Sequence, residues 1–91
     1  MAIKYTKQYL HKLEDLMAET DFTLRYERGN FKSGYCLLNT EKIAVVNKYF
    51  SRDGKINCLV DIIKSIEIDT DNLSEKNQSL FLELSQTKLE L

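Results

Sequence analysis

The chain has 91 residues, of which 43% are hydrophobic and 30% charged, and its formal net charge is −1. This length predicts one domain over residues 1–91 with a single core. Three glycines, no proline and no tryptophan exclude the disordered and collagen-like classes. No apolar run approaches the roughly 18 residues needed to cross a bilayer, and residues 1–10 are too polar for a signal peptide. We therefore expect a cytoplasmic protein with no membrane partner.

The first expected element is an amphipathic helix over about residues 4–19. Its apolar residues recur at helical spacing, and they are Tyr5, Tyr9, Leu10, Leu13, Leu16 and Met17. From Phe22 the period changes to two, because Phe22, Leu24 and Tyr26 alternate with polar residues. This alternation predicts a strand with one buried face over residues 22–27.

Two further apolar runs, residues 35–39 and 42–47, flank a short connection at Asn39-Thr40-Glu41. Such a connection is typical of a hairpin, so the sequence predicts a three-stranded antiparallel meander. Both later strands are apolar on both faces. We therefore expect another element to cover the second face of the sheet.

Two helices are expected after the sheet. Ile56, Leu59, Val60 and Ile63 follow helical spacing, and Asp53 is the expected N-cap of that helix. Asn72 with Glu75 resembles a capping box and predicts a third helix over about residues 73–87. The predicted fold class is α+β, in the order α-β-β-β-α-α, with the helices packed on the sheet.

The sequence carries no recognised pattern for metal, cofactor or catalytic chemistry. His11, Cys36 and Cys58 stand in three different expected elements, so no metal site is predicted. The phosphate-loop, dinucleotide-turn and nucleophile-elbow patterns do not occur, and we expect no cofactor. Each cysteine lies in an apolar segment, which favours a packed, reduced thiol over a nucleophile. An enzymatic role is therefore not favoured.

Basic charge gathers in the middle of the chain, where residues 25–57 hold seven basic residues against three acidic ones. In the predicted meander, the loops 27–34 and 47–54 meet at one edge of the sheet. A helix N-terminus with nearby cations suits a phosphate or carboxylate, and aromatic residues beside it suit a base. The candidate ligand-binding residues are Arg28, Asn30, Lys32, Asn47, Lys48 and Arg52.

The opposing interpretation of this basic loop edge is structural. Gly29 and Gly34 then make turns, Phe31 and Phe50 cover the end of the core, and the cationic side chains are solvated. Charged loops are ordinary on small domains. Both interpretations remain open at the level of sequence.

The segment from Arg25 to Cys36 (RYERGNFKSGYC), followed by residues 45–50 (VVNKYF), resembles a family of short uncharacterised bacterial proteins of about this length. The resemblance covers most of the chain through the second helix. It implies a stand-alone bacterial cytosolic protein, and it carries no assigned activity, substrate or cofactor.

A non-enzymatic binding or interaction module is the function that the sequence favours. The leucine-bearing third helix predicts a homodimer, with Leu80, Phe81 and Leu84 at the interface. The alternative is a small anionic ligand, such as a phosphate or nucleotide, bound or turned over at the basic loop edge. A further alternative is nucleic-acid binding by the same surface.

Overall fold

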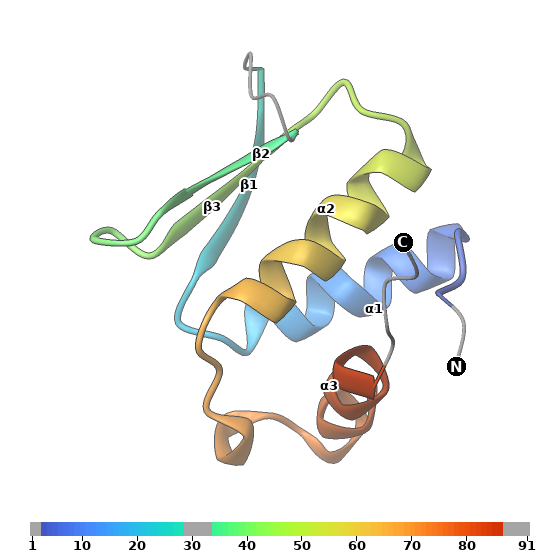
Figure 1. Cartoon of the computed structure of the whole chain (residues 1–91), viewed down its shortest axis with the longest axis vertical. Coiled ribbons are helices and arrows are strands. Elements are labelled where there is room, and N and C mark those ends of the chain that lie inside the picture. The colour runs from blue at the N-terminus through green and yellow to red at the C-terminus, as the bar shows by residue number, and fades with distance from the viewer. Residues whose placement is uncertain (1–2, 29–33, 87–91) are drawn as a thin grey trace.

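The computed structural model describes residues 3–28 and 34–86, and it has the predicted order of helices and strands (Figure 1). The elements are α1 (Lys7–Ala18), β1 (Thr23–Glu27), β2 (Tyr35–Leu38), β3 (Ile43–Asn47), α2 (Arg52–Ser65), the 3-10 turn η1 (Thr70–Asn72) and α3 (Glu75–Gln86). The α+β class and the α-β-β-β-α-α order are therefore confirmed, with one short 3-10 turn added before α3. Asn30, Phe31 and Lys32 lie outside the described residues.

The sheet is mixed, and the prediction of an antiparallel meander is wrong on this point. The strand order is β1-β3-β2, so β3 lies between the other two strands. β3 pairs with β2 in the predicted antiparallel hairpin and with β1 in parallel. The physical reason is burial: Ala44, Val45 and Val46 are all buried in β3, and a strand that is apolar on both faces is best placed at the centre of a sheet. β1, with Arg25 and Glu27, takes an edge.

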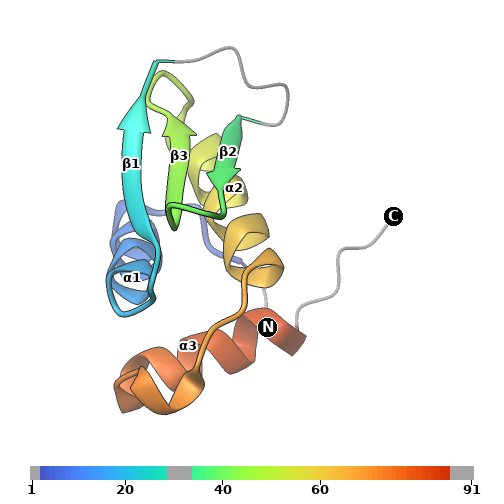
Figure 2. The same cartoon turned by 90° about the vertical axis from the view of Figure 1, so that its left-hand side faces the viewer.

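The helices cover one face of this sheet. Figure 2 shows α1 and α2 behind the sheet, and α3 packs in turn against α1 and α2. The inner face presents Leu24 and Tyr26 from β1 and the buried Ala44 and Val46 from β3 to the helices. These residues join a core whose largest members come from the helices: Leu13, Leu16, Met17, Ile56, Leu59, Ile62, Ile63 and Leu84.

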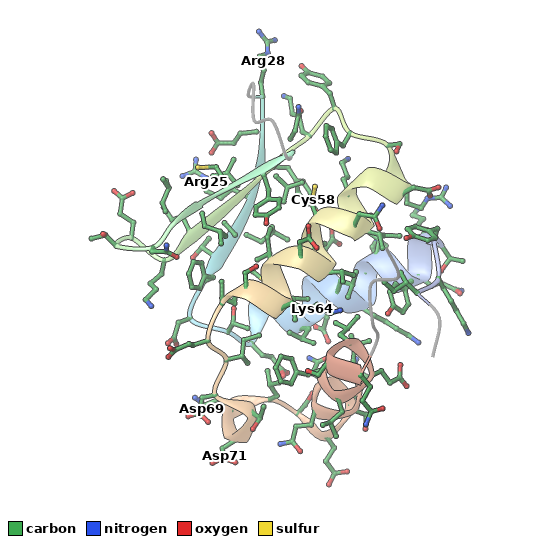
Figure 3. The ribbon with its side chains drawn as sticks, in the orientation of Figure 1. Arg25, Arg28, Cys58, Lys64, Asp69 and Asp71 are labelled. Carbon is green, nitrogen blue, oxygen red and sulfur yellow. The ribbon has the colours of Figure 1, made fainter. Side chains whose placement is uncertain are left out.

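The outer face of the sheet carries alternate residues of the same strands. Arg25 of β1, Val45 of β3 and Cys36 of β2 are register neighbours on this face, and Figure 3 shows Arg25 on the side away from the helices. No helix in the described ranges 3–28 and 34–86 covers it. The expected cover of the second face is therefore not found there.

Capping side chains set the starts of the first two helices. The Tyr9 amide donates to the Thr6 hydroxyl (3.0 Å) at the start of α1, and the Gly54 amide donates to the Ser51 hydroxyl (3.1 Å) at the start of α2. The prediction that Asp53 caps the second helix is wrong. Asp53 lies in the first turn, where its negative charge still favours the positive end of the helix dipole.

The start of α3 also differs from the prediction. The Gln78 amide donates to the Ser74 carbonyl (2.8 Å), and Asn72 instead ends the 3-10 turn. The predicted capping box at Asn72 and Glu75 is therefore wrong, because α3 begins at Glu75 and the Asn77 amide donates to the hydroxyl of the preceding Ser74 (3.4 Å). Within the part of the chain that is described, no helix is both long enough and apolar enough to cross a membrane.

Candidate functional site

The strand ends that flank the two predicted loops lie together at one end of the sheet. The Lys48 amide donates to the Glu27 carbonyl (3.1 Å), and the Asn47 amide donates to the Gly34 carbonyl (2.8 Å). These bonds bring together the end of β1, the start of β2 and the end of β3. The convergence survives the change in strand order because β1 and β3 run in the same direction, opposite to β2.

Three of the predicted ligand-binding residues meet at this end around Tyr49. The Tyr49 ring is 64% exposed, with the Arg28 guanidinium 5.9 Å and the Lys48 ammonium 5.3 Å from its centroid. The Asn47 side chain accepts a hydrogen bond from the Tyr49 amide (3.0 Å) and shapes the turn. Figure 3 shows Arg28 projecting from this end of the sheet. We name Arg28, Lys48 and Tyr49 the Tyr49 cluster.

Other parts of the predicted edge have structural roles. Phe50 is half-buried and packs on the core. Its ring lies so close to Gly34 that a Cβ placed on Gly34 would be 2.2 Å from the Cε2 atom of Phe50. Tyr35 also packs on the core from β2, so both partly buried rings contribute to the fold. Arg52 is exposed as the first residue of α2, beside a helix end where the Ser51 hydroxyl already accepts the Gly54 amide.

Residues 3–28 and 34–86 contain no group of three or more histidine, cysteine, aspartate or glutamate side chains that could hold a metal ion. Cys58 is buried, and burial raises the pKa of its thiol, with a smaller contribution from the charge of Asp61. A raised pKa disfavours the thiolate that a nucleophile needs. Cys36 is a half-exposed thiol on the outer face of the sheet, and His11 is exposed on α1.

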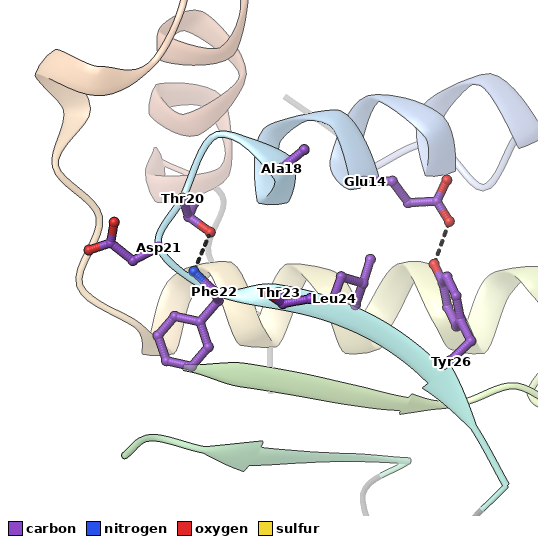
Figure 4. Close-up of a pocket in the computed structure, with 8 residues that line it drawn as sticks. All are labelled: Glu14, Ala18, Thr20, Asp21, Phe22, Thr23, Leu24 and Tyr26. Carbon is purple, nitrogen blue, oxygen red and sulfur yellow. Dashed lines mark hydrogen bonds between the residues drawn. The ribbon is translucent and has the colours of Figure 1, made fainter. Parts of the chain in front are cut away.

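A groove that the sequence did not reveal runs between α1 and the neighbouring edge of β1 (Figure 4). Its volume is about 580 Å³. Apolar and acidic side chains line it, chiefly Glu14, Ala18, Asp21, Phe22, Leu24 and Tyr26. We call it the α1/β1 groove. Strand alternation indicated that Leu24 and Tyr26 face inward, but the groove depends on how α1 lies against β1, which no local pattern encodes.

The backbone of β1 presents hydrogen-bonding groups along this groove. The Thr23 amide donates to the Lys42 carbonyl (2.8 Å), and the Glu27 carbonyl accepts from Lys48 (3.1 Å). In a parallel ladder, alternate residues bond to the same neighbour, so Thr23, Arg25 and Glu27 direct their polar groups to β3. Leu24 and Tyr26 therefore direct theirs away from β3, at the edge of the sheet that borders the groove.

The charged side chains that line the groove are acidic. Among the described residues that line it, Glu14 and Asp21 carry charge. The Tyr26 phenol donates a hydrogen bond to the Glu14 carboxylate (Figure 4). Burial raises the pKa of Tyr26, and the bond to Glu14 raises it further, so the phenol stays protonated and keeps donating. Lys55 lies 5.3 Å from the centroid of the Tyr26 ring.

The predicted dimer-interface residues lie mainly inside the chain. Leu80 and Leu84 are buried in its core, and Phe81 packs partly buried against that core. Leu82 is the large apolar side chain of α3 that faces outward, with 59% exposure. Self-association through Leu80, Phe81 and Leu84 stays a prediction.

Comparison of the chain with protein-family models, curated proteins and solved structures finds no match. The resemblance in residues 25–36 and 45–50 therefore stays a prediction. Any functional inference rests on the geometry of the site.

Proposed function

We propose that the protein is a non-enzymatic interaction module that binds an extended segment of a partner protein in the α1/β1 groove. The observation that carries this proposal is the coincidence of a groove with an edge of β1 that no other strand in residues 3–28 and 34–86 pairs with. The inward side chains of Leu24 and Tyr26 line the groove, and their backbone groups point away from β3 to the sheet edge that borders it. Exposed sheet edges bind extended peptides by adding a strand.

Strand addition would use both the backbone groups at the edge of β1 and the groove beside them. Two amides and two carbonyls, from Leu24 and Tyr26, give a peptide four backbone hydrogen bonds in an antiparallel arrangement. Alternate peptide side chains then enter the groove on the α1 side, which supplies specificity. On the outer face, Arg25 and Glu27 form an ion pair of 2.7 Å, and charged side chains on an edge strand disfavour uncontrolled pairing. The edge thus accepts a matched segment while resisting aggregation.

The test is selection of peptides from a random heptapeptide display library, followed by amide hydrogen exchange on the selected complex. We expect protection of the Leu24 and Tyr26 amides in the complex. The Leu37 amide, on the opposite edge strand β2, is the internal control and should not change. A peptide N-methylated at the residues that pair with β1 should lose binding. Selection of no peptide, or protection confined to β2, contradicts the proposal.

A second candidate function, binding of a small anion or nucleotide, is supported by the Tyr49 cluster. An exposed aromatic ring with two cations near it offers a stacking surface and charge for a base and its phosphate. We expect Arg28→Glu with Lys48→Glu to abolish binding of a fluorescently labelled mononucleotide at low salt, measured by anisotropy. Lys7→Glu with Lys12→Glu, on exposed positions of α1, is the charge-matched control. Equal loss in both double variants excludes a specific site.

Cytosolic location, bacterial origin and a homodimer are further parts of the proposal. The resemblance supports the first two. The leucine-bearing α3 motivates the homodimer, and the exposed Leu82 beside the partly buried Phe81 is the apolar contact that we propose for a second copy. Native mass spectrometry should show a dimer that Leu82→Asp converts to monomer. A wild-type monomer at micromolar concentration contradicts the homodimer.

A further inference from the structure

The α1/β1 groove has an acidic group at each end and apolar side chains in the middle. Glu14 lies at the Tyr26 end, to which it is hydrogen bonded, and Asp21 precedes Phe22 at the other end (Figure 4). Between them, Ala18 of α1 and Leu24 of β1 line the groove. Lys42 and Lys55 each lie 5.3 Å from the ring centroid of Phe22 and Tyr26, respectively, but neither lines the groove. On the groove side, a ligand lying along β1 therefore meets negative charge, then an apolar surface, then negative charge.

We propose that the segment bound in this groove carries two basic residues four positions apart, with a small apolar residue midway between them. This inference rests on the proposed function, because it assumes that the segment adds to β1 as an antiparallel strand. It names the chemistry that the groove selects: a Lys or Arg at each end and a Val, Ala or similar residue at the centre.

The spacing follows from strand geometry. Phe22, Leu24 and Tyr26 lie on the same face, so neighbouring positions along the groove are about 7 Å apart. In an antiparallel pair, directly opposed side chains point to the same face. Peptide residues i, i+2 and i+4 then stand opposite Tyr26, Leu24 and Phe22, and residues i+1 and i+3 face the outer side. The acidic ends thus correspond to positions i and i+4.

The chemistry at each position follows from the lining. Glu14 accepts one hydrogen bond from Tyr26, and a carboxylate has about four acceptor positions, so it still accepts from a lysine or arginine. Asp21 is exposed at the far end and attracts the second cation. At the centre, Ala18 leaves room for a small side chain above Leu24. A peptide carboxylate at either end meets like charge.

The outer face offers no matching selection. There the basic Arg25 and acidic Glu27 neutralise each other at 2.7 Å, so a cation at i+1 or i+3 gains little. Affinity therefore depends on whether the basic residues stand at positions i and i+4, which face the groove, and not only on how many basic residues the peptide has. A groove that recognises this pattern therefore prefers basic residues at i and i+4, whereas a surface that attracts positive charge nonspecifically binds both arrangements equally.

The experiment compares three synthetic nine-residue peptides by fluorescence anisotropy on the full chain. They share Ser-Thr flanks and differ in the core: Lys-Thr-Val-Thr-Lys in phase, Thr-Lys-Val-Lys-Thr out of phase, and Gln-Thr-Val-Thr-Gln neutral. We expect the in-phase peptide to bind about tenfold more tightly than the other two, because two partly shielded ion pairs contribute about that factor. The advantage should shrink as salt rises.

The double variant Glu14→Gln with Asp21→Asn should abolish the in-phase advantage, so that the in-phase peptide binds no more tightly than the neutral peptide measured on the same variant. The side-chain amide that replaces the Glu14 carboxylate keeps an oxygen that accepts from Tyr26, so the fold retains that bond. Glu41→Gln with Asp61→Asn, at exposed positions outside the groove, is the matched control and should retain the advantage. Circular dichroism verifies that both double variants fold.

Two failures are distinguishable. If all three peptides bind equally and protect the Leu24 and Tyr26 amides, the inference about basic residues is wrong and the interaction module stands. If the in-phase and out-of-phase peptides bind equally and no β1 amide is protected, attraction is nonspecific and both proposals fail.

Discussion

The phenol of Tyr26 on β1 donates a hydrogen bond to the carboxylate of Glu14 on α1, at one end of the α1/β1 groove. This contact ties the edge strand to the first helix at a point 12 residues apart in the chain. It also fixes the position of one of the two acidic groups in the groove. The same bond thus contributes to stability and orients the candidate binding site.

Replacement of Tyr26 by phenylalanine should cost stability and alter its dependence on alkaline pH. A hydrogen bond to a charged acceptor is worth about 1.5–3 kcal/mol, and we expect the lower end of this range because Tyr26 is half-buried. Burial and Glu14 raise the folded-state pKa of Tyr26 above its unfolded value, so its contribution is complete below about pH 10 and is lost as the pH rises through the raised pKa. Urea unfolding at neutral pH and above about pH 10 measures both effects.

Tyr49→Phe is the control, because it removes an exposed phenol and keeps the bond between Tyr26 and Glu14. It should follow the wild-type alkaline dependence. An unchanged alkaline slope in Tyr26→Phe would show that Tyr26 is not the group responsible.

Glu19→Gln should weaken the acid dependence of stability. The Glu19 carboxylate accepts a hydrogen bond from the Ser74 amide (2.8 Å), and this bond, with a smaller one from Asn77, lowers the pKa of Glu19. The contribution is present above the unfolded pKa of about 4.3 and is lost as the pH falls through the lowered folded value. Acid titration followed by circular dichroism measures the slope.

Glu41→Gln, an exposed carboxylate in the turn between β2 and β3, should retain the wild-type acid slope. Identical slopes for Glu19→Gln and wild type would mean that the contact between the end of α1 and the start of α3 does not stabilise the fold.

Local patterns predicted the elements, and long-range packing decided their arrangement. The alternation of Leu24 and Tyr26 correctly predicted the inner face of β1. The apolar residues on both faces of Ile43–Asn47 predict an element that covers the second face of the sheet, whereas in the structure they belong to the central strand. Strand order is set by contacts between distant segments, and a hairpin preference between sequence neighbours does not encode it.

The candidate sites likewise combine features that local patterns predict with features that long-range packing decides. Charge counting identified the loops that hold Arg28 and Lys48, because the antiparallel relation of β2 to its neighbours already places them together. The opposing structural interpretation correctly predicts that Phe50 packs on the core, and its ring lies over Gly34. The groove depends on the contact of Glu14 with Tyr26, for which the sequence carries no spacing signal.

Gly34→Ala should destabilise the fold by about 2–4 kcal/mol, through backbone strain and overpacking together. Gly34 has φ +88°, in the left-handed region that favours glycine. Its new Cβ would lie 2.2 Å from Cε2 of Phe50 and 2.9 Å from Sγ of Cys58. Phe50→Leu combined with Gly34→Ala should recover part of the loss, because it relieves the clash and leaves the strain. Wild-type stability of Gly34→Ala in urea unfolding would contradict this placement of β2.

Leu84→Ala and Leu82→Ala form a matched pair on α3. Leu84 is 1% exposed and packs in the core, whereas Leu82 is 59% exposed. We expect Leu84→Ala to cost about 2–5 kcal/mol, because it leaves a cavity, and Leu82→Ala to change stability by less than about 0.5 kcal/mol in the monomer. Urea midpoints measured at two protein concentrations separate folding from association. A concentration-dependent loss in Leu82→Ala assigns Leu82 to an interface between copies, and equal small losses in both variants would show that α3 does not pack on α1 and α2.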